Sequence, residues 1–221
     1  MLFRASRRSM LILTLVALPL LVGSKCVFIF SSGGGSSHKG DDKNDKPKET
    51  MQTAAVSSGH FGAPPVEGVS FESGSHAGVT GRNGEFQFEP GGTVRFFIGD
   101  IELGQAANAK SVMTARDLVA DSASDAPAVV NISRLLLSLD AEPNDGVITI
   151  PESVRTSAIR SDAGVSSAIE FLDFSDDPAF TNAASQLVAV LTDDYPFTAM
   201  LVDADYAHNK MIKSSATRPG Q

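Results

Sequence analysis

Polar and apolar residues alternate through much of the chain between positions 66 and 103. The alternating segments are 66–72, 85–89, 94–98 and 101–103. Because successive side chains of a strand point to opposite sides of a sheet, these segments predict strands with one buried face, as Phe86 and Phe88 illustrate by sharing one side. Asn83-Gly84 stands between two such segments and predicts a tight hairpin. Short antiparallel strands with tight turns predict a small sandwich-like or barrel-like sheet.

The apolar spacing changes to steps of three and four residues after position 125. A helix is predicted from Asp125, its capping residue, through Leu139, and a second from Asp177-Pro178 through Leu191. A short turn at 114–118 and a terminal helix at 206–213 are also predicted, whereas 161–176 is predicted to be a loop. Strands followed by helices predict an α+β fold, a small antiparallel sandwich-like module followed by a helical segment packed on it.

The first residues have the pattern of an export signal. Arg4, Arg7 and Arg8 precede an apolar run from Met10 to Val22, which is short for a membrane span and typical of a signal-peptide core. The paired arginines also resemble a twin-arginine signal, although so apolar a core favours the general secretion route.

The one cysteine of the chain, Cys26, directly follows this run and precedes a Gly/Ser-rich stretch. This arrangement resembles the leader of bacterial lipoproteins, which implies a lipid anchor on Cys26 and a membrane as partner. Lys25 departs from the pattern, because a small residue is usual there. Two alternatives stay open: cleavage after the small-residue site Val22-Gly23-Ser24, which releases the protein, or an uncleaved anchor that continues to Phe30.

Composition divides the chain into four parts. We expect a signal peptide at 1–26, a disordered Gly/Ser and charged tether at 27–60, a β-rich module at 61–110 and a helical part at 111–221. The tether lacks apolar periodicity and cannot offset the entropy of ordering. Its root-mean-square reach is roughly 30 Å.

Charge argues against one class of function, and cysteine content excludes one kind of stabilisation. The formal net charge is −8, and the leader holds several cations and no acids, so the body is more acidic still. Such a body argues against nucleic-acid binding, which needs a basic face. A single cysteine excludes an internal disulfide, so the core alone must hold the fold together.

Several turn and core motifs resemble a known kind of module. They are Gly68-Val69-x-Phe71, Asn83-Gly84-x-Phe86-x-Phe88-x-Pro90-Gly91, Val94-x-Phe96-x-Ile98-Gly99-Asp100 and Asn131-Ile132-x-Arg134-Leu135-Leu136. The sequence is similar to transthyretin-like, or carboxypeptidase-regulatory-like, β-modules, and more so to uncharacterised bacterial envelope lipoproteins that join such a module to a helical tail. The resemblance implies a fold and a place in the cell envelope, and it brings no catalytic residues.

One stretch has the elements of a calcium loop. With one inserted residue, Asp140, Glu142, Asp145 and Glu152 fall at ligand positions of an EF-hand-type loop, with Gly146 at its turn. The alternative is a helix end followed by a turn that leads into a strand at 147–150. No other cofactor is indicated, since the four histidines lie far apart in the sequence without zinc-like spacing.

Two other groups of residues are candidates for function. Ser73 and Ser75 with His76 suggest a nucleophile and a base, although no nucleophile-elbow motif is present. Phe61, expected to be exposed near the tether, and Phe97, the outward neighbour of a core position, could contribute to a binding patch.

Three classes of function remain. The favoured one is a non-catalytic protein of the cell envelope, tethered to the outer membrane or to the periplasmic face of a membrane, which binds a protein or glycan or serves as a structural module. A released, periplasmic or secreted form is the alternative location. The other two classes are a calcium-stabilised adhesion module and an envelope hydrolase, for which Ser75 and His76 are the only support.

Overall fold

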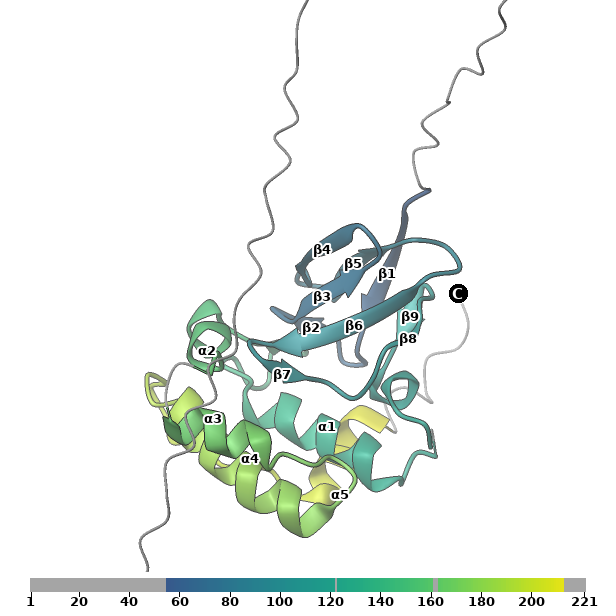
Figure 1. Cartoon of the computed structure of the whole chain (residues 1–221). Helices are drawn as coiled ribbons and strands as arrows, with labels where there is room; N and C mark the ends of the chain where they lie inside the picture. Colours follow the sequence, from purple (N-terminus) through teal and green to yellow (C-terminus); the bar gives the residue numbers. More distant parts are fainter. Residues whose placement is uncertain (1–54, 122, 161–162, 213–221) are drawn as a thin grey trace, which may run out of the picture. The chain divides into compact units, whose positions relative to one another are not determined.

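The structure, a computed structural model, describes residues 55–121, 123–160 and 163–212. Within these residues all strands except one short strand at Ile148–Thr149 come before the α-helices, which confirms the predicted α+β class (Figure 1). The predicted signal peptide, Cys26 and most of the predicted tether lie outside the described residues.

Most strands belong to two sheets. The first sheet has the order β5-β1-β9, with β5 at Glu85–Phe88, β1 at Ser57–Phe61 and β9 at Val112–Met113. The second sheet has the order β4-β3-β6-β7, with β4 at His76–Val79, β3 at Ser70–Ser73, β6 at Thr93–Ile98 and β7 at Ile101–Glu102; β8 at Ala107–Asn108 also pairs with β6. Within these two sheets, all pairs are antiparallel except β1–β9.

Phenylalanine rings fill the space between the two sheets. Phe61 of the first sheet stacks on Phe96 of the second, with ring centroids 4.1 Å apart. Phe86 of the first sheet meets Phe96 edge-on at 5.2 Å and Phe71 at 5.9 Å. Aromatic pairs at these separations stabilise a core beyond the area they bury. The alternation in the sequence therefore predicted the inner faces of the sandwich correctly.

The Asn83-Gly84 turn forms, but it does not make the predicted hairpin. Gly84 N–H donates to Gly81 O at 2.8 Å, which closes the turn, yet β4 before it belongs to the second sheet and β5 after it to the first. Phe61, the last residue of β1, donates its N–H to Gly84 O at 2.8 Å and so connects the turn to β1. The turn therefore crosses from the second sheet to the first, where β5 pairs with β1.

Strand β1 begins inside the segment that we predicted to be tether. Residues 57–60 are polar or small and show no apolar alternation, so no strand was predicted there. Their backbone pairs with β5 on one side, and β9 pairs with the end of the strand on the other. Gly59 allows this packing, because a Cβ on it would lie 2.6 Å from the ring of Phe86. The boundary at residue 60 is therefore wrong.

The predicted strand 66–72 divides at Gly68 and serves two sheets. Its first part, β2 at Val66–Glu67, pairs in parallel with β10 at Ile148–Thr149, and its second part is β3. Gly68 has φ +84° and approaches Ile150 so closely that a Cβ would lie 2.0 Å from the Ile150 carbonyl oxygen. The buried Thr80 hydroxyl stabilises the break, accepting from Val69 N–H at 3.0 Å and donating to Val66 O at 2.7 Å.

The helices form a layer beside the sandwich (Figure 1). They are α1 at Pro127–Ser138, α2 at Glu152–Ser157, α3 at Ala163–Glu170, α4 at Asp177–Leu191 and α5 at Ala204–Ala207, with a 3₁₀ turn η1 at Ala115–Leu118 and a π-helical turn η2 at His208–Ile212. The buried faces of α1 and α4 contain the apolar residues that the spacing predicted, among them Ile132, Leu136 and Leu187.

Three details of the helical half differ from the predictions. Helix α3 lies within the predicted loop 161–176, because Val165, Ala168 and Ile169 form a short buried stripe. The N-cap of α4 is Asp176 rather than Asp177, since Asp177 binds an arginine on α1. The N-cap of α1 is Ala126 rather than Asp125.

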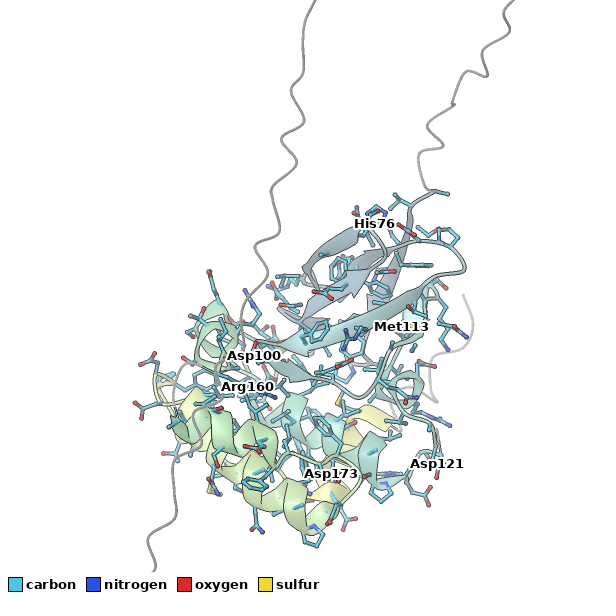
Figure 2. All side chains as sticks on the ribbon, in the orientation of Figure 1. His76, Asp100, Met113, Asp121, Arg160 and Asp173 are labelled. Carbon is cyan, nitrogen blue, oxygen red and sulfur yellow. The ribbon has the colours of Figure 1, made fainter. Side chains whose placement is uncertain are left out.

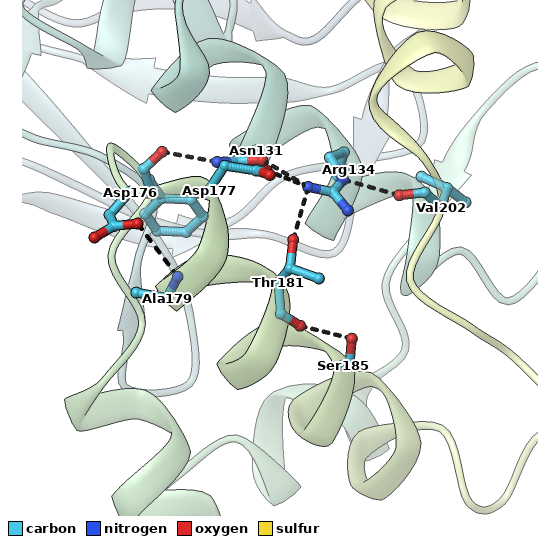
Figure 3. A network of polar contacts seen from close by, with 9 residues as sticks. Asn131, Arg134, Asp176, Asp177, Ala179, Thr181, Ser185 and Val202 are labelled. Atoms are coloured by element: carbon cyan, nitrogen blue, oxygen red, sulfur yellow. Dashed lines mark hydrogen bonds and ion pairs between the residues drawn. The ribbon is translucent and has the colours of Figure 1, made fainter.

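That arginine, Arg134, links α1, α4 and the segment at Val202 through one polar network (Figure 3). It is buried on α1 and donates through one terminal nitrogen to Asp177 Oδ1 at 2.8 Å and Thr181 Oγ1 at 3.2 Å, both on α4. The same nitrogen donates to Asn131 Oδ1 at 3.0 Å, and Nε donates to Val202 O at 2.9 Å. With its polar groups satisfied, the network has the character of a structural joint.

Candidate ligand-binding groove

Two of the predicted calcium ligands, Asp140 and Asp145, accept hydrogen bonds from nearby backbone N–H groups. Asp140 Oδ1 accepts the backbone N–H groups of Glu142 and Thr149, both at 3.1 Å, and Asp145 Oδ1 accepts Val147 N–H at 2.8 Å. Glu152 is the first residue of α2. Among the residues that the structure describes, no group of three or more His, Cys, Asp or Glu side chains is placed to hold a metal ion. The stretch 140–150 therefore has the geometry of the alternative reading, a helix end and turn leading into β10.

Burial also changes the acidity of Asp140. The side chain is largely withdrawn from water, and this desolvation raises its pKa above the usual value, although the two backbone N–H groups act in the opposite direction. The nearby charges of Asp145 and Glu142 raise the pKa further. The carboxyl group is thus an internal acceptor that holds the turn.

The serine and histidine candidates do not form a catalytic arrangement. Ser75 Oγ donates to Glu89 Oε1 at 2.9 Å, and Ser75 N–H donates to the same oxygen at 3.0 Å. These bonds lower the pKa of the half-buried Glu89 carboxyl. Ser73 Oγ is buried and donates to Thr93 O at 2.7 Å. His76 Nε2 is buried without a hydrogen-bond partner (Figure 2 labels this histidine). A triad would need the imidazole between the hydroxyl and the carboxylate.

The two phenylalanine candidates have opposite outcomes. Phe61, which we expected to be exposed, is fully buried between the sheets. Phe97 lies between the inward-facing Phe96 and Ile98 on β6, and it is half-buried on the outer face of the second sheet. In the pairing register it stands opposite Ser70 on β3 and Glu102 on β7.

A groove of two lobes begins at this ring. The first lobe, of about 430 Å³, covers the outer face of the second sheet and is lined by Ser70, Glu72, Phe97, Asp100 and Glu102, among others. The second lobe, of about 690 Å³, also includes Asp100 and Glu102 and continues between β7, the end of η1 and residues 169–175. We call the two lobes together the groove. Both lobes open to solvent, and both have volumes typical of ligand sites.

The side chains at the junction of the lobes are held in place. Asp100 Oδ2 accepts Arg160 N–H at 2.8 Å, and Figure 2 shows Asp100 and Arg160 close together. Glu102 forms a paired interaction with Arg95, whose Nε donates to Glu102 Oε1 at 2.7 Å. The Arg95 guanidinium lies 5.1 Å from the centre of the Phe97 ring. The carboxylate of Glu102 raises the pKa of Arg95.

The far end of the second lobe is polar as well. Asp173 Oδ1 accepts Ser175 Oγ at 2.6 Å and Ser175 N–H at 2.8 Å, which lowers the pKa of the Asp173 carboxyl. Glu170 is exposed at the end of α3, and half-buried Phe174 contributes an apolar wall. These residues fall in the segment that we predicted to be a loop, so sequence reasoning missed them. Only the acidic character of 161–176 pointed to them.

Fold and groove together define an α+β protein with an acidic, solvent-open surface site between a β-sandwich and a helical layer. The chain is similar to two curated proteins of Escherichia coli. It is 33% identical over 90 residues to the "Putative lipoprotein AcfD homolog" of strain K12 and 32% identical over 90 residues to the "Putative lipoprotein YghJ" of strain H10407. Each match covers 41% of this chain and 6% of the relative, so the chain spans a small part of their length.

The other comparisons add no relative. No protein-family model matches the chain, and no solved structure matches it. Both E. coli proteins carry the word lipoprotein in their names. Within the described residues, no helix combines the length and the hydropathy that crossing a bilayer requires.

Proposed function

We propose that the protein is a lipid-anchored, non-catalytic binding module of the bacterial cell envelope, with Cys26 as the anchored residue and the groove as its binding surface. The observation that carries the proposal is the similarity to two lipoproteins in a chain whose one cysteine follows a signal-like apolar run. The outer membrane or the periplasmic face of a membrane is the proposed location.

The groove supports the binding role. Its junction carboxylates are fixed by a backbone N–H and by an arginine, and a preformed site lowers the entropic cost of binding. Neither Ser75 nor His76 lines either lobe, and the contacts of Ser75 run to a carboxylate instead of an imidazole. A non-catalytic role is the function that this arrangement favours.

Cell fractionation of a bacterium that expresses the full chain tests the anchor. We expect the wild-type protein in the membrane fraction, and the Cys26→Ser variant in the soluble periplasmic or secreted fraction, because the serine cannot take the thioether-linked lipid. Ser24→Ala is the matched control and stays with the membrane, since alanine is also a small residue before the cysteine. Equal membrane retention of wild type and Cys26→Ser contradicts the anchor at Cys26.

A further inference from the structure

We propose that the groove binds an oligosaccharide whose sugars are neutral or carry amino groups, and that it discriminates against acidic sugars. This inference deepens the proposed function, because it names the ligand class of the same groove. Four observations carry it: the extended shape of the groove, the outward Phe97 ring, the fixed hydrogen-bonding groups and the sign of the charge.

The shape favours a chain over a compact ligand. The two lobes share Asp100 and Glu102 and continue from the outer sheet face to the end of α3. Their volumes of about 430 and 690 Å³ are each large enough for a small ligand. A ligand of several linked units can occupy both lobes and cross the junction.

Phe97 gives the first lobe an apolar surface at a position where a water-facing strand usually has a polar side chain. The ring is only half-buried and lines the lobe beside Glu72 and Ser70, with the Arg95 guanidinium over it at 5.1 Å from its centre. The C–H groups on one face of a sugar ring are apolar and pack against aromatic rings, while the hydroxyl groups at the sugar's edge need polar partners. An apolar ring among polar groups meets both needs.

The polar groups of the groove are suited to hydroxyl groups. A carboxylate has two acceptor oxygens and can accept from two neighbouring hydroxyls at once. Asp100 and Asp173 each have one oxygen fixed by the bonds described above, from Arg160 N–H to Oδ2 and from Ser175 to Oδ1. The second oxygen of each is then presented in a defined direction. Gln105, in the same lobe, adds an amide that can both donate and accept.

The charge decides between kinds of sugar. Five carboxylates line the two lobes (Glu72, Asp100, Glu102, Glu170 and Asp173), whereas Arg160 is the one basic residue among the lining residues described. Arg95 pairs with Glu102 from beside the groove, and the other carboxylates keep the groove net negative. An anionic sugar would be repelled, a neutral sugar tolerated and an amino sugar attracted.

Isothermal titration calorimetry on the full-length chain in detergent tests the inference with four probes. They are tetramers of N-acetylglucosamine, which is neutral, glucosamine, which is cationic, galacturonic acid, which is anionic, and lysine, which is cationic but not a sugar. We expect the first two to bind, glucosamine more tightly, and galacturonic acid to bind at least tenfold more weakly than either. The lysine peptide, which has no sugar face to place on Phe97, should bind at least tenfold more weakly than the glucosamine tetramer.

Two variants localise the binding. Phe97→Ala should weaken both glucosamine-based tetramers at least tenfold without changing the melting temperature by more than a few degrees, because the side chain is on the outer face of the sheet. Phe197→Ala is the matched control: Phe197 is 39% exposed and lines neither lobe, so its loss should leave the affinities unchanged.

The failures are distinguishable. Lysine peptide that binds as tightly as the glucosamine tetramer overturns the sugar inference and leaves a binding groove, so the proposed function stands. The inference is also overturned if none of the three sugar tetramers binds. It is overturned as well if Phe97→Ala and Phe197→Ala weaken sugar binding equally. None of these results bears on the membrane anchor, which the fractionation of Cys26→Ser tests separately.

Discussion

At the scale of single residues, acidic side chains have a structural role at some positions and are exposed to solvent at others. Asp140 is buried and its carboxyl accepts two backbone N–H groups, whereas Glu170 is exposed at the edge of the groove. The spacing of the acids at 140–152 predicted a calcium site. Spacing alone does not show that backbone N–H groups already bond to the oxygens of Asp140 and Asp145. Phe97 was identifiable from the sequence, because the alternation of β6 places it opposite the core face.

Asp140→Asn tests the structural role of this carboxyl. The pKa of Asp140 is raised in the folded protein, mainly by desolvation. Its contribution to stability is therefore fully present below the unfolded-state pKa and is lost as pH rises through the raised value. Asparagine keeps the acceptor and has no charge, so it should become more stable relative to wild type as the pH rises from about 4 to 7. Urea unfolding at several pH values measures the difference.

Asp140→Ala serves as the control for the same position. It leaves Glu142 N–H and Thr149 N–H without their acceptor and should cost on the order of 1–3 kcal/mol at every pH. If Asp140→Asn instead loses stability relative to wild type as the pH rises, the negative charge stabilises the fold and our account of this residue is wrong.

At the scale of elements, the local sequence pattern predicted the secondary structure of each segment more reliably than its pairing partner. The faces of β5 and β6 and the buried sides of α1 and α4 follow their periodicity. The Asn83-Gly84 hairpin failed because β1, which has no apolar alternation, is the partner of β5. The groove could not be predicted either, since it joins residues near 72, 100 and 173 that only the folded chain brings together.

Gly68→Ala tests the break between β2 and β3. A Cβ at this position would lie 2.0 Å from Ile150 O, and the φ of +84° is unfavourable for alanine. Backbone strain costs on the order of 1–3 kcal/mol, and the overlap adds roughly 1–3 kcal/mol. Gly91→Ala is a matched control, because its φ is +79° but a Cβ would meet nothing within 4 Å. Thermal or urea unfolding should show a much larger loss for Gly68→Ala; equal losses would mean that the approach of Ile150 is unimportant.

The polar network around Arg134 gives a second prediction at this scale, on the stability of the contact between α1 and α4. Arg134→Ala removes its hydrogen bonds to α4 and to Val202 and its contact with the Phe180 ring, and should destabilise the fold by about 3 kcal/mol. Asp177→Ala should cost only about 1 kcal/mol, because the Asp177 side chain is 62% exposed and its ion pair is screened by water. Chemical denaturation of the two variants measures both values. A larger loss for Asp177→Ala than for Arg134→Ala contradicts the assignment of the joint to the arginine.

At the scale of the whole molecule, we propose a protein that works outside the cytoplasm. This proposal rests on the leader-like first residues, the single cysteine and the similarity to two E. coli proteins named putative lipoproteins. The acidic body and the groove between sandwich and helices add a surface suited to binding. The fold class followed from the sequence, while the surface that we assign to binding required the assembled structure.

The mass of the mature N-terminus, measured on protein purified from the membrane fraction, tests this account most directly. We predict a chain that begins at Cys26 and carries a diacylglyceryl group on its sulfur. A chain that begins at an unmodified Lys25, or one that still contains Met1, would contradict the lipid anchor.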